Sequence, residues 1–280
     1  MRNINIIARY EVGRQIRSTG GVLFLALAGI IYAYVALRLV KWAAEFKDKV
    51  PLGGSDDPVQ GIFTGFIGWL VEIEPSQLEK LIANHSPFAL VFFFVALAVN
   101  PLLAIMASSD QTAGDIQTRH IRYLLLRTDR GSLYWGKTLG SLVFYGASLA
   151  VLIGLVAGAA FLGGAIGAGD LLYFGRIWLT LTLFAVPFIA LNGFSGALTG
   201  HPGLAMLVTL AYYMVVWLIS AIGSWGAPAV ENVQYLSPSA FKFELAADDL
   251  AILGKAAGHM AIVTVVALAV GLTLFKRRDV

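Results

Sequence analysis

The sequence contains no cysteine and few charged residues. With zero Cys in 280 residues, disulfides, thiolate metal sites and cysteine nucleophiles are excluded. Only 13% of the residues are charged and 58% are hydrophobic, whereas soluble domains are roughly one-quarter charged and about half apolar. This imbalance is too large for one soluble core. The formal net charge of +3 is also too small to indicate a nucleic-acid partner.

Long runs without any charged residue define the class of protein. Residues 138–169 and 177–230 contain no Lys, Arg, Asp or Glu. A helix needs about 20 apolar residues to cross a bilayer, so the second run is too long for one helix, and the turn sequence GHPG at 200–203 divides it. The sequence therefore predicts an all-α, polytopic membrane protein with a single transmembrane domain, residues 1–280. Six transmembrane helices are predicted, at residues 21–40, 88–107, 138–162, 177–199, 204–225 and 256–275.

The first 20 residues differ from these spans in being basic. They carry four arginines and a single acid, Glu11. Apolar residues recur at every fourth position, which favours a basic interfacial helix at the membrane surface. This apolar stripe consists of Ile4, Ala8, Val12 and Ile16. A plain basic flank of the first span is the alternative.

Two external loops are predicted to contain short interfacial helices. The first loop, 41–87, includes an apolar stretch at 61–71 that is too short to cross a bilayer and carries aromatic residues at helical spacing. The last loop, 226–255, contains an amphipathic piece, SPSAFKFELAADDLAIL. Both pieces are expected to lie in the headgroup region rather than to span the membrane.

The predicted spans hold a few polar and small residues. Asn100, Asn192 and Ser195 are interpreted as partners in hydrogen bonds between helices rather than as the lining of a substrate path. Small residues four positions apart predict close helix packing, and these pairs are Gly136/Gly140, Gly154/Gly158 and Gly196/Gly200.

The distribution of basic residues predicts the orientation. With both termini in the cytoplasm, 12 of the 20 Lys and Arg residues fall on cytoplasmic segments, although the external loops are longer. Short cytoplasmic loops carry an excess of Lys and Arg, so this arrangement is the favoured one. We therefore expect a multi-pass protein of the cell inner (plasma) membrane, with the N-terminus, the C-terminus and loop 110–137 in the cytoplasm.

Loop 110–137 is the longest charged segment between two apolar runs. Its apolar residues Ile121, Leu124 and Leu125 are spaced for one side of a short helix at 116–126, with arginines around them. Such a helix is suited to an apolar groove whose rim carries carboxylates. A basic anchor on lipid headgroups is the alternative. The residues predicted to dock on a partner are Asp115, Arg119, Arg122, Leu124, Leu125, Arg127, Arg130 and Lys137.

The same loop contains a match to the nucleotide-binding pattern G-x-x-x-x-G-K-[ST], which begins at Gly131 and ends at Thr138. The residues between its glycines are bulky, and a membrane span follows instead of a βαβ unit. The match is therefore interpreted as coincidental, and no cofactor site is predicted in this chain. The four histidines are scattered without metal-ligand spacing, so no metal site is predicted either.

The order of parts resembles the permease subunit of type-2 ABC exporters. The matching features in the loop are Gly114-Asp115, the leucine run that starts at Leu124, Arg130 and Gly136-Lys137. Outside the loop, the sequence LSP at 236–238 and the C-terminal FKRRD at 275–279 are similar to common motifs of the family.

The resemblance implies a coupling helix in loop 110–137 that sits in a cleft of a separate cytoplasmic ATPase subunit. ATP and Mg would then be bound by that partner chain, and this chain would be a non-catalytic subunit that pairs with a second permease copy or a homologous permease. The lack of charge within the spans and the aromatic stretch at 61–71 favour export of a lipid-like or amphipathic substrate. One alternative is a mechanical, signalling or assembly complex with the same fold. Another is an intramembrane enzyme, which would need polar residues clustered at one depth, and the sequence of the spans indicates no such cluster.

Overall fold

The computed structural model describes residues 2–49, 85–224, 232–246 and 249–278. Within these ranges the chain is almost entirely helical and contains no β-strand. The interfacial helix predicted at 61–71 lies outside the described residues.

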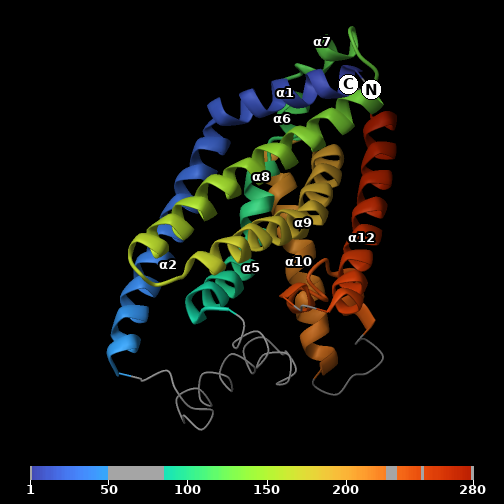
Figure 1. Cartoon of the computed structure of the whole chain (residues 1–280). Coiled ribbons are helices and arrows are strands. Elements are labelled where there is room, and N and C mark those ends of the chain that lie inside the picture. Colours follow the sequence, from blue (N-terminus) through green and yellow to red (C-terminus); the bar gives the residue numbers. More distant parts are fainter. Residues whose placement is uncertain (1, 50–84, 225–231, 247–248, 279–280) are drawn as a thin grey trace.

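Six helices are long and apolar enough to cross a membrane, which confirms the predicted all-helical class and the number of candidate spans (Figure 1). They are α2 (Thr19–Lys49), α5 (Pro87–Ser108), α8 (Arg130–Leu162), α9 (Ala168–Thr199), α10 (Pro202–Ser224) and α12 (Leu250–Arg277).

Helices α8, α9 and α12 begin earlier than the predicted spans, because polar residues can start a helix before its apolar part begins. Asp129 caps α8 by accepting a hydrogen bond from the Ser132 backbone N–H at 2.7 Å. Asp249 caps α12 in the same way, at 2.8 Å from the backbone N–H two residues later. In the first turn of α9, Asp170 accepts from the Gly167 N–H at 3.1 Å. Hydropathy detects only the apolar part of each helix, so the sequence placed these starts too late.

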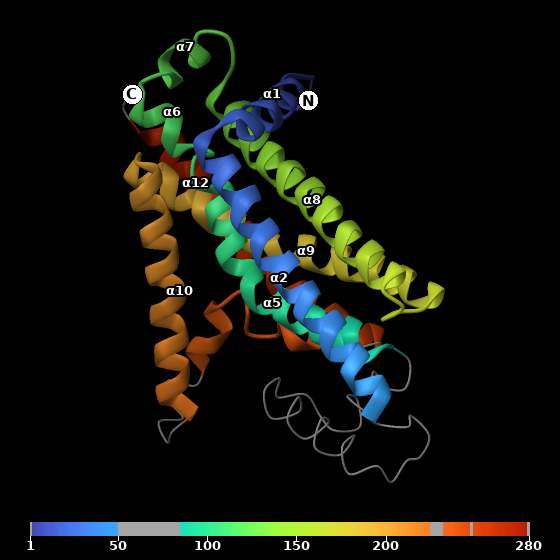
Figure 2. The same cartoon turned by 90° about the vertical axis from the view of Figure 1, so that its left-hand side faces the viewer.

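Three shorter helices gather at one end of the bundle. They are α1 (Arg2–Arg17), α6 (Ala113–Gln117) and α7 (Ile121–Leu125). Both termini lie at this same end, which we call the termini end (Figures 1 and 2). In the last loop the described residues form two 3-10 helices, η1 (Asn232–Leu236) and η2 (Phe243–Ala246), and the end of the predicted amphipathic piece, from Leu250 on, belongs to α12.

A helix is present at α1, but its inward face differs from the predicted apolar stripe. The helix packs against α8. Ala8, Glu11 and Gln15 are buried, whereas Ile16 of the predicted stripe is exposed. The inward face is therefore partly polar, and the apolar periodicity alone did not identify it.

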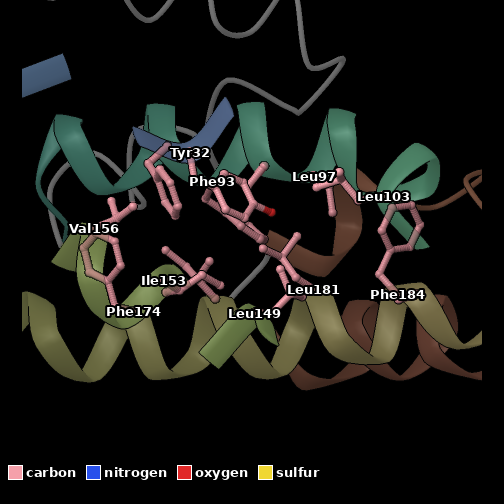
Figure 3. Packing of buried hydrophobic residues seen from close by; sticks show 14 of the residues in the cluster. Tyr32, Phe93, Leu97, Leu103, Leu149, Ile153, Val156, Phe174, Leu181 and Phe184 are labelled. Carbon is pink, nitrogen blue, oxygen red and sulfur yellow. The ribbon is translucent and has the colours of Figure 1, made fainter. Parts of the chain in front are cut away.

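Helix α9 lies at the centre and contacts α5, α8, α10 and α12. Apolar side chains from these helices form one continuous core, in which Leu97 and Leu103 of α5 lie across from Leu181 and Phe184 of α9 (Figure 3). Large aromatic rings fill much of this core. The fully buried ones include Phe24, Phe92, Phe184 and Phe188. Close packing of this kind holds helices together where lipid removes the hydrophobic driving force.

Two buried asparagines connect the helices through hydrogen bonds. The amide of Asn100 in α5 donates to the carbonyl of Leu181 in α9 at 3.0 Å. The amide of Asn192 in α9 donates to the carbonyl of Ile105 in α5 at 2.9 Å, and its oxygen accepts from the Thr209 hydroxyl of α10 at 3.1 Å. The predicted use of these asparagines between helices is confirmed.

Ser195 and Gly196, one turn after Asn192, also face the neighbours of α9. The Ser195 hydroxyl lies 2.9 Å from the hydroxyl of Thr209 in α10. A Cβ atom added at Gly196 would lie 2.5 Å from the Thr112 hydroxyl oxygen. The predicted contact of Ser195 with another helix and the close packing at Gly196 are therefore confirmed.

Glycines on α8 allow α1 to approach closely. A Cβ atom at Gly140 would lie 2.6 Å from the Cβ of Glu11, and one at Gly136 would lie 2.7 Å from the Cβ of Ile7. Close packing at this glycine pair is therefore confirmed. At the pair 154/158, further along α8, an added Cβ would meet no atom of the described chain within 4 Å, so the close packing predicted there is not found in that part of the chain.

We expect Gly140→Ala to be less stable than Gly154→Ala by about 1–3 kcal/mol, because the added methyl forces α1 away from α8. Gly154→Ala on the same helix is the matched control. It gains the same helix propensity, roughly 1 kcal/mol, without a clash. Thermal unfolding in detergent, followed by tryptophan fluorescence, compares the two variants. Equal stability of both would contradict the close contact between α1 and α8.

Candidate functional site

The segment between α5 and α8 folds as two short helices, not as the single helix predicted at 116–126. Thr118 donates its hydroxyl to the carbonyl of Gly114 at 2.9 Å, where α6 ends. Arg119 follows with φ of 58°, in the left-handed region that ends a helix. Helix α7 then starts anew. A break of this kind leaves no signal in apolar spacing, so the prediction of one helix was wrong.

The apolar side predicted to enter a partner's groove faces the protein itself. Ile121 is buried, and Leu124 and Leu125 pack beside it in a cluster that includes Phe275 of α12 and Tyr134 of α8. These leucines anchor α7 to the bundle. Their side chains are therefore directed away from the surface that a partner would meet.

The outward face of the segment carries other apolar residues. Tyr123 is 70% exposed and Leu126 is 83% exposed. Sequence spacing did not single them out, because both belong to the same unbroken apolar run as the buried leucines. Three exposed arginines lie close to these two residues in the sequence. We call Arg119, Arg122, Tyr123, Leu126 and Arg127 together the α6–α7 surface.

Arg130, another predicted docking residue, is used inside the protein. Its guanidinium donates to the carbonyls of Phe275 at 3.2 Å and Lys276 at 2.9 Å, at the end of α12. Arg278 in turn donates to the carbonyl of Ala197 at 2.6 Å, near the end of α9. The last carbonyls of a helix have no partner within the helix and attract cations. The two arginines thus tie the start of α8 to α12, and the end of α12 to α9.

Asp115 and Lys137, also predicted to dock, are buried at the termini end. The Lys137 ammonium forms an ion pair with Asp115 of α6, and it lies 3.3 Å from a carboxylate oxygen of Glu11 in α1. The side chains of Lys137, Asp115 and Glu11 are 5%, 8% and 1% exposed, respectively. Their charges therefore face one another and are not presented to a partner.

Arg14 of α1 extends this set of buried charges. Its guanidinium lies 2.7 Å from a Glu11 oxygen, 3.1 Å from Asp110 and 3.6 Å from Asp115. Burial alone would lower the pKa of Arg14. The hydrogen bond to Glu11 and the charges of Glu11, Asp110 and Asp115 outweigh that effect and raise the pKa above its ordinary value. We call Glu11, Arg14, Asp110, Asp115 and Lys137 the ion cluster.

The ion cluster holds three carboxylates and two cations. Neutral side chains complete its hydrogen bonds, since the Gln15 amide donates to Glu11 at 3.1 Å and to the Ser141 hydroxyl at 2.6 Å. The predicted lack of a polar cluster concerned the spans, and the ion cluster lies outside the predicted spans, in the first 20 residues and in loop 110–137. The one sequence signal was Glu11, the only acid in a basic segment, and nothing in the sequence indicated that it would meet α6 and α8.

The nucleotide-binding pattern that starts at Gly131 forms the first turns of α8. A phosphate loop needs a non-helical backbone whose N–H groups point at the phosphates. In this segment Asp129 already accepts the N–H of Ser132, and Lys137 is held in the ion cluster. This geometry counts against ATP binding by these residues.

The part of the chain that the structure describes contains no group of three His, Asp or Glu residues placed to hold a metal ion.

No protein-family model matches the chain, and no curated protein sequence matches it.

We expect Lys137→Met to lower the free energy of unfolding by about 3–5 kcal/mol, because it leaves the three carboxylates of the ion cluster with one cation, Arg14. Lys137→Met combined with Asp115→Asn removes one charge of each sign. This double variant should recover a large part of the lost stability. Thermal unfolding in detergent measures both, and a Lys137→Met single variant as stable as the parent would refute a stabilising ion cluster.

Proposed function

We propose that this chain is the membrane subunit of an ATP-driven transporter, similar to a type-2 ABC exporter permease, and that its α6–α7 surface docks on a separate ATPase subunit. The observation that carries the proposal is the α6–α7 surface itself. Its arginines and its apolar residues Tyr123 and Leu126 are exposed together at the termini end, while the opposite side of α7 is anchored.

The chemistry of this surface suits a protein partner that carries carboxylates around an apolar pocket. Arginine binds carboxylates through two parallel hydrogen bonds, and Tyr and Arg are among the residues that contribute most to binding energy in protein interfaces. A face made of arginine alone would suit lipid headgroups equally well. The exposed Tyr123 and Leu126 favour a groove on a protein.

The proposed orientation places the termini end in the cytoplasm of a cell with this protein in its inner (plasma) membrane. The arginines of α1, those of the α6–α7 surface and the basic end of α12 all lie at the termini end (Figure 1). Positive charge of this kind is retained on the cytoplasmic side. A cytoplasmic ATPase would therefore meet the α6–α7 surface directly, and the outer face of α1 would lie along the membrane surface.

ATP and Mg would be bound by the partner chain, and a second permease, identical or homologous, would complete the complex. The cargo class that fits best is lipid-like or amphipathic. In its support, the core between the spans is filled with apolar and aromatic side chains, and its buried asparagines are hydrogen-bonded to neighbouring helices. Among the described residues the buried charged side chains are Glu11, Asp115 and Lys137 of the ion cluster, so the core between the spans offers no line of charged groups for an ion.

The ion cluster is the observation that favours the second candidate, an intramembrane enzyme. Lys137 and Ser141 are four residues apart on α8 and so share one face, an arrangement that suits a lysine base and a serine nucleophile. In the structure the Lys137 nitrogen is engaged in ion pairs with Glu11 and Asp115, and the Ser141 oxygen accepts a hydrogen bond from Gln15. The cluster is therefore better suited to holding helices together than to catalysis.

Charge reversal tests the docking proposal. The chain with Arg119→Glu and Arg122→Glu should lose an ATPase that co-purifies with the parent from native membranes, because two new carboxylates would oppose a carboxylate-lined groove. Repulsion of this kind costs at least about 1.4 kcal/mol, so co-purified ATP hydrolysis should fall at least about tenfold.

The matched control reverses the charge of Arg9 and Arg17 by substitution with Glu. Both are exposed arginines of α1 at the same end. This control changes the net charge equally and should keep the ATPase. Unchanged ATP hydrolysis in the Arg119/Arg122 variant would sink the docking proposal. Loss of activity in both variants would assign the effect to general charge rather than to the α6–α7 surface.

A further inference from the structure

The α6–α7 surface is attached to the rest of the protein by more than its two chain connections. The ion cluster joins separate elements at the termini end. Glu11 and Arg14 come from α1, Asp110 from the turn after α5, Asp115 from α6, and Lys137 from α8. The partners of one ion pair, Glu11 and Lys137, are 126 residues apart in the sequence.

We infer that the ion cluster is a latch that fixes the α6–α7 surface to α1, so that a displacement of this surface moves α1 and α2 with it. The link between α6 and α1 stands on the geometry alone. Only the source of the displacement, a docked ATPase, rests on the proposed function.

Arg14 is the residue that makes the link direct. Besides its ion pairs with the Asp110 and Asp115 carboxylates, it donates to the backbone carbonyl of Asp110 at 2.9 Å. One guanidinium thus holds both the side chain and the main chain of the stretch that leads into α6. Its planar fork of donors permits this, whereas a lysine ammonium offers a single point charge.

Burial makes the link resistant to force. The side chains of Glu11, Asp115 and Lys137 are less than one-tenth exposed, and Arg14 is 20% exposed. Separating buried ion pairs leaves charges without water or counter-charge, which is strongly unfavourable. When the α6–α7 surface is pushed, moving α1 as a unit with α6 is therefore the less costly response.

Helix α1 passes the movement to the first candidate span. Only Ser18 separates α1 from α2, and its hydroxyl donates to the Gln15 carbonyl at 3.0 Å and accepts from the Gly21 N–H at 3.0 Å. These bonds hold the junction in one geometry. Helix α2 then packs on α8 through the ring of Phe24 and on α5 through the ring of Tyr32. The structure thus provides a continuous path from α7 through α6 and α1 to α2.

The lack of cysteine in the chain permits a direct test with spin labels. Labels at Ile6→Cys on α1 and Tyr123→Cys on α7 occupy positions that are exposed in the parent. Pulsed electron–electron double resonance in phosphatidylcholine nanodiscs then reports the distance between α1 and α7. Combined Arg14→Gln and Asp110→Asn removes one charge of each sign, so the net charge of the ion cluster is unchanged. The width of the distance distribution should increase about twofold in this variant.

Arg9→Gln is the control, because Arg9 is exposed on the same helix outside the ion cluster. Its distribution should match that of the parent. An unchanged width in the Arg14/Asp110 variant would overturn the latch. If that variant fails to fold, Arg14→Lys decides, since it keeps the charge but loses the planar fork of donors. A wider distribution supports the latch, and an unchanged one overturns it even if the melting temperature falls.

This measurement needs no ATPase, so its failure is distinguishable from failure of the docking proposal. If the latch exists but no ATPase docks on the α6–α7 surface, the distance distribution of the Arg14/Asp110 variant will be broader than that of the parent. Charge reversal at Arg119 and Arg122 will then leave ATP hydrolysis unchanged. Docking without a latch would give the reverse pair of results.

Discussion

The burial of the Lys137 ammonium between the carboxylates of Glu11 and Asp115 is the constraint on which the termini end of this protein depends. A buried ammonium is tolerated only beside a counter-charge. The two counter-charges come from α1 and α6, so α8 cannot take its place without bringing both of these helices with it. The glycines of α8 that face α1 serve the same requirement, because they let Glu11 come close enough to Lys137. The ion cluster holds Asp115, which precedes the α6–α7 surface, and Lys137, which follows it. These two fixed residues determine where the α6–α7 surface is exposed.

A different rule governs the interior of the bundle. There the polar groups are neutral amides and hydroxyls, and each of Asn100 and Asn192 is satisfied by a neighbouring helix. Uncharged groups suffice in this region because apolar and aromatic side chains from four neighbouring helices already pack against α9. Charge is concentrated at the termini end, where ion pairs can join segments that have little apolar surface of their own. The protein thus has a packed, apolar interior and a charged termini end, and the proposed partner would act on the termini end.

Much of the fold could be predicted from the sequence, and the errors have physical causes. The six candidate spans followed from uncharged runs, and the use of Asn100 and Asn192 between helices followed from their place inside those runs. The starts of α8 and α12 were placed too late because capping by Asp129 and Asp249 is a local hydrogen bond that hydropathy does not detect. The break at Arg119 was missed because a single left-handed residue leaves the apolar spacing unchanged. The packing of Ile121, Leu124 and Leu125 against the bundle decides which side of α7 faces outward.

The sequence by itself determined the class of this protein and the number of its candidate spans. A run of about 20 uncharged apolar residues has essentially one solution in a bilayer, a helix that satisfies its own backbone, so local composition is enough. Only the tertiary structure decided which charges of loop 110–137 remain available to a partner. Asp115, Arg130 and Lys137 share that loop with Arg119, Arg122 and Arg127, yet the first three are bound inside the protein. Whether a charge is exposed or neutralised depends on a counter-charge or carbonyl that can come from as far as 148 residues away in the sequence, and no local pattern carries that information.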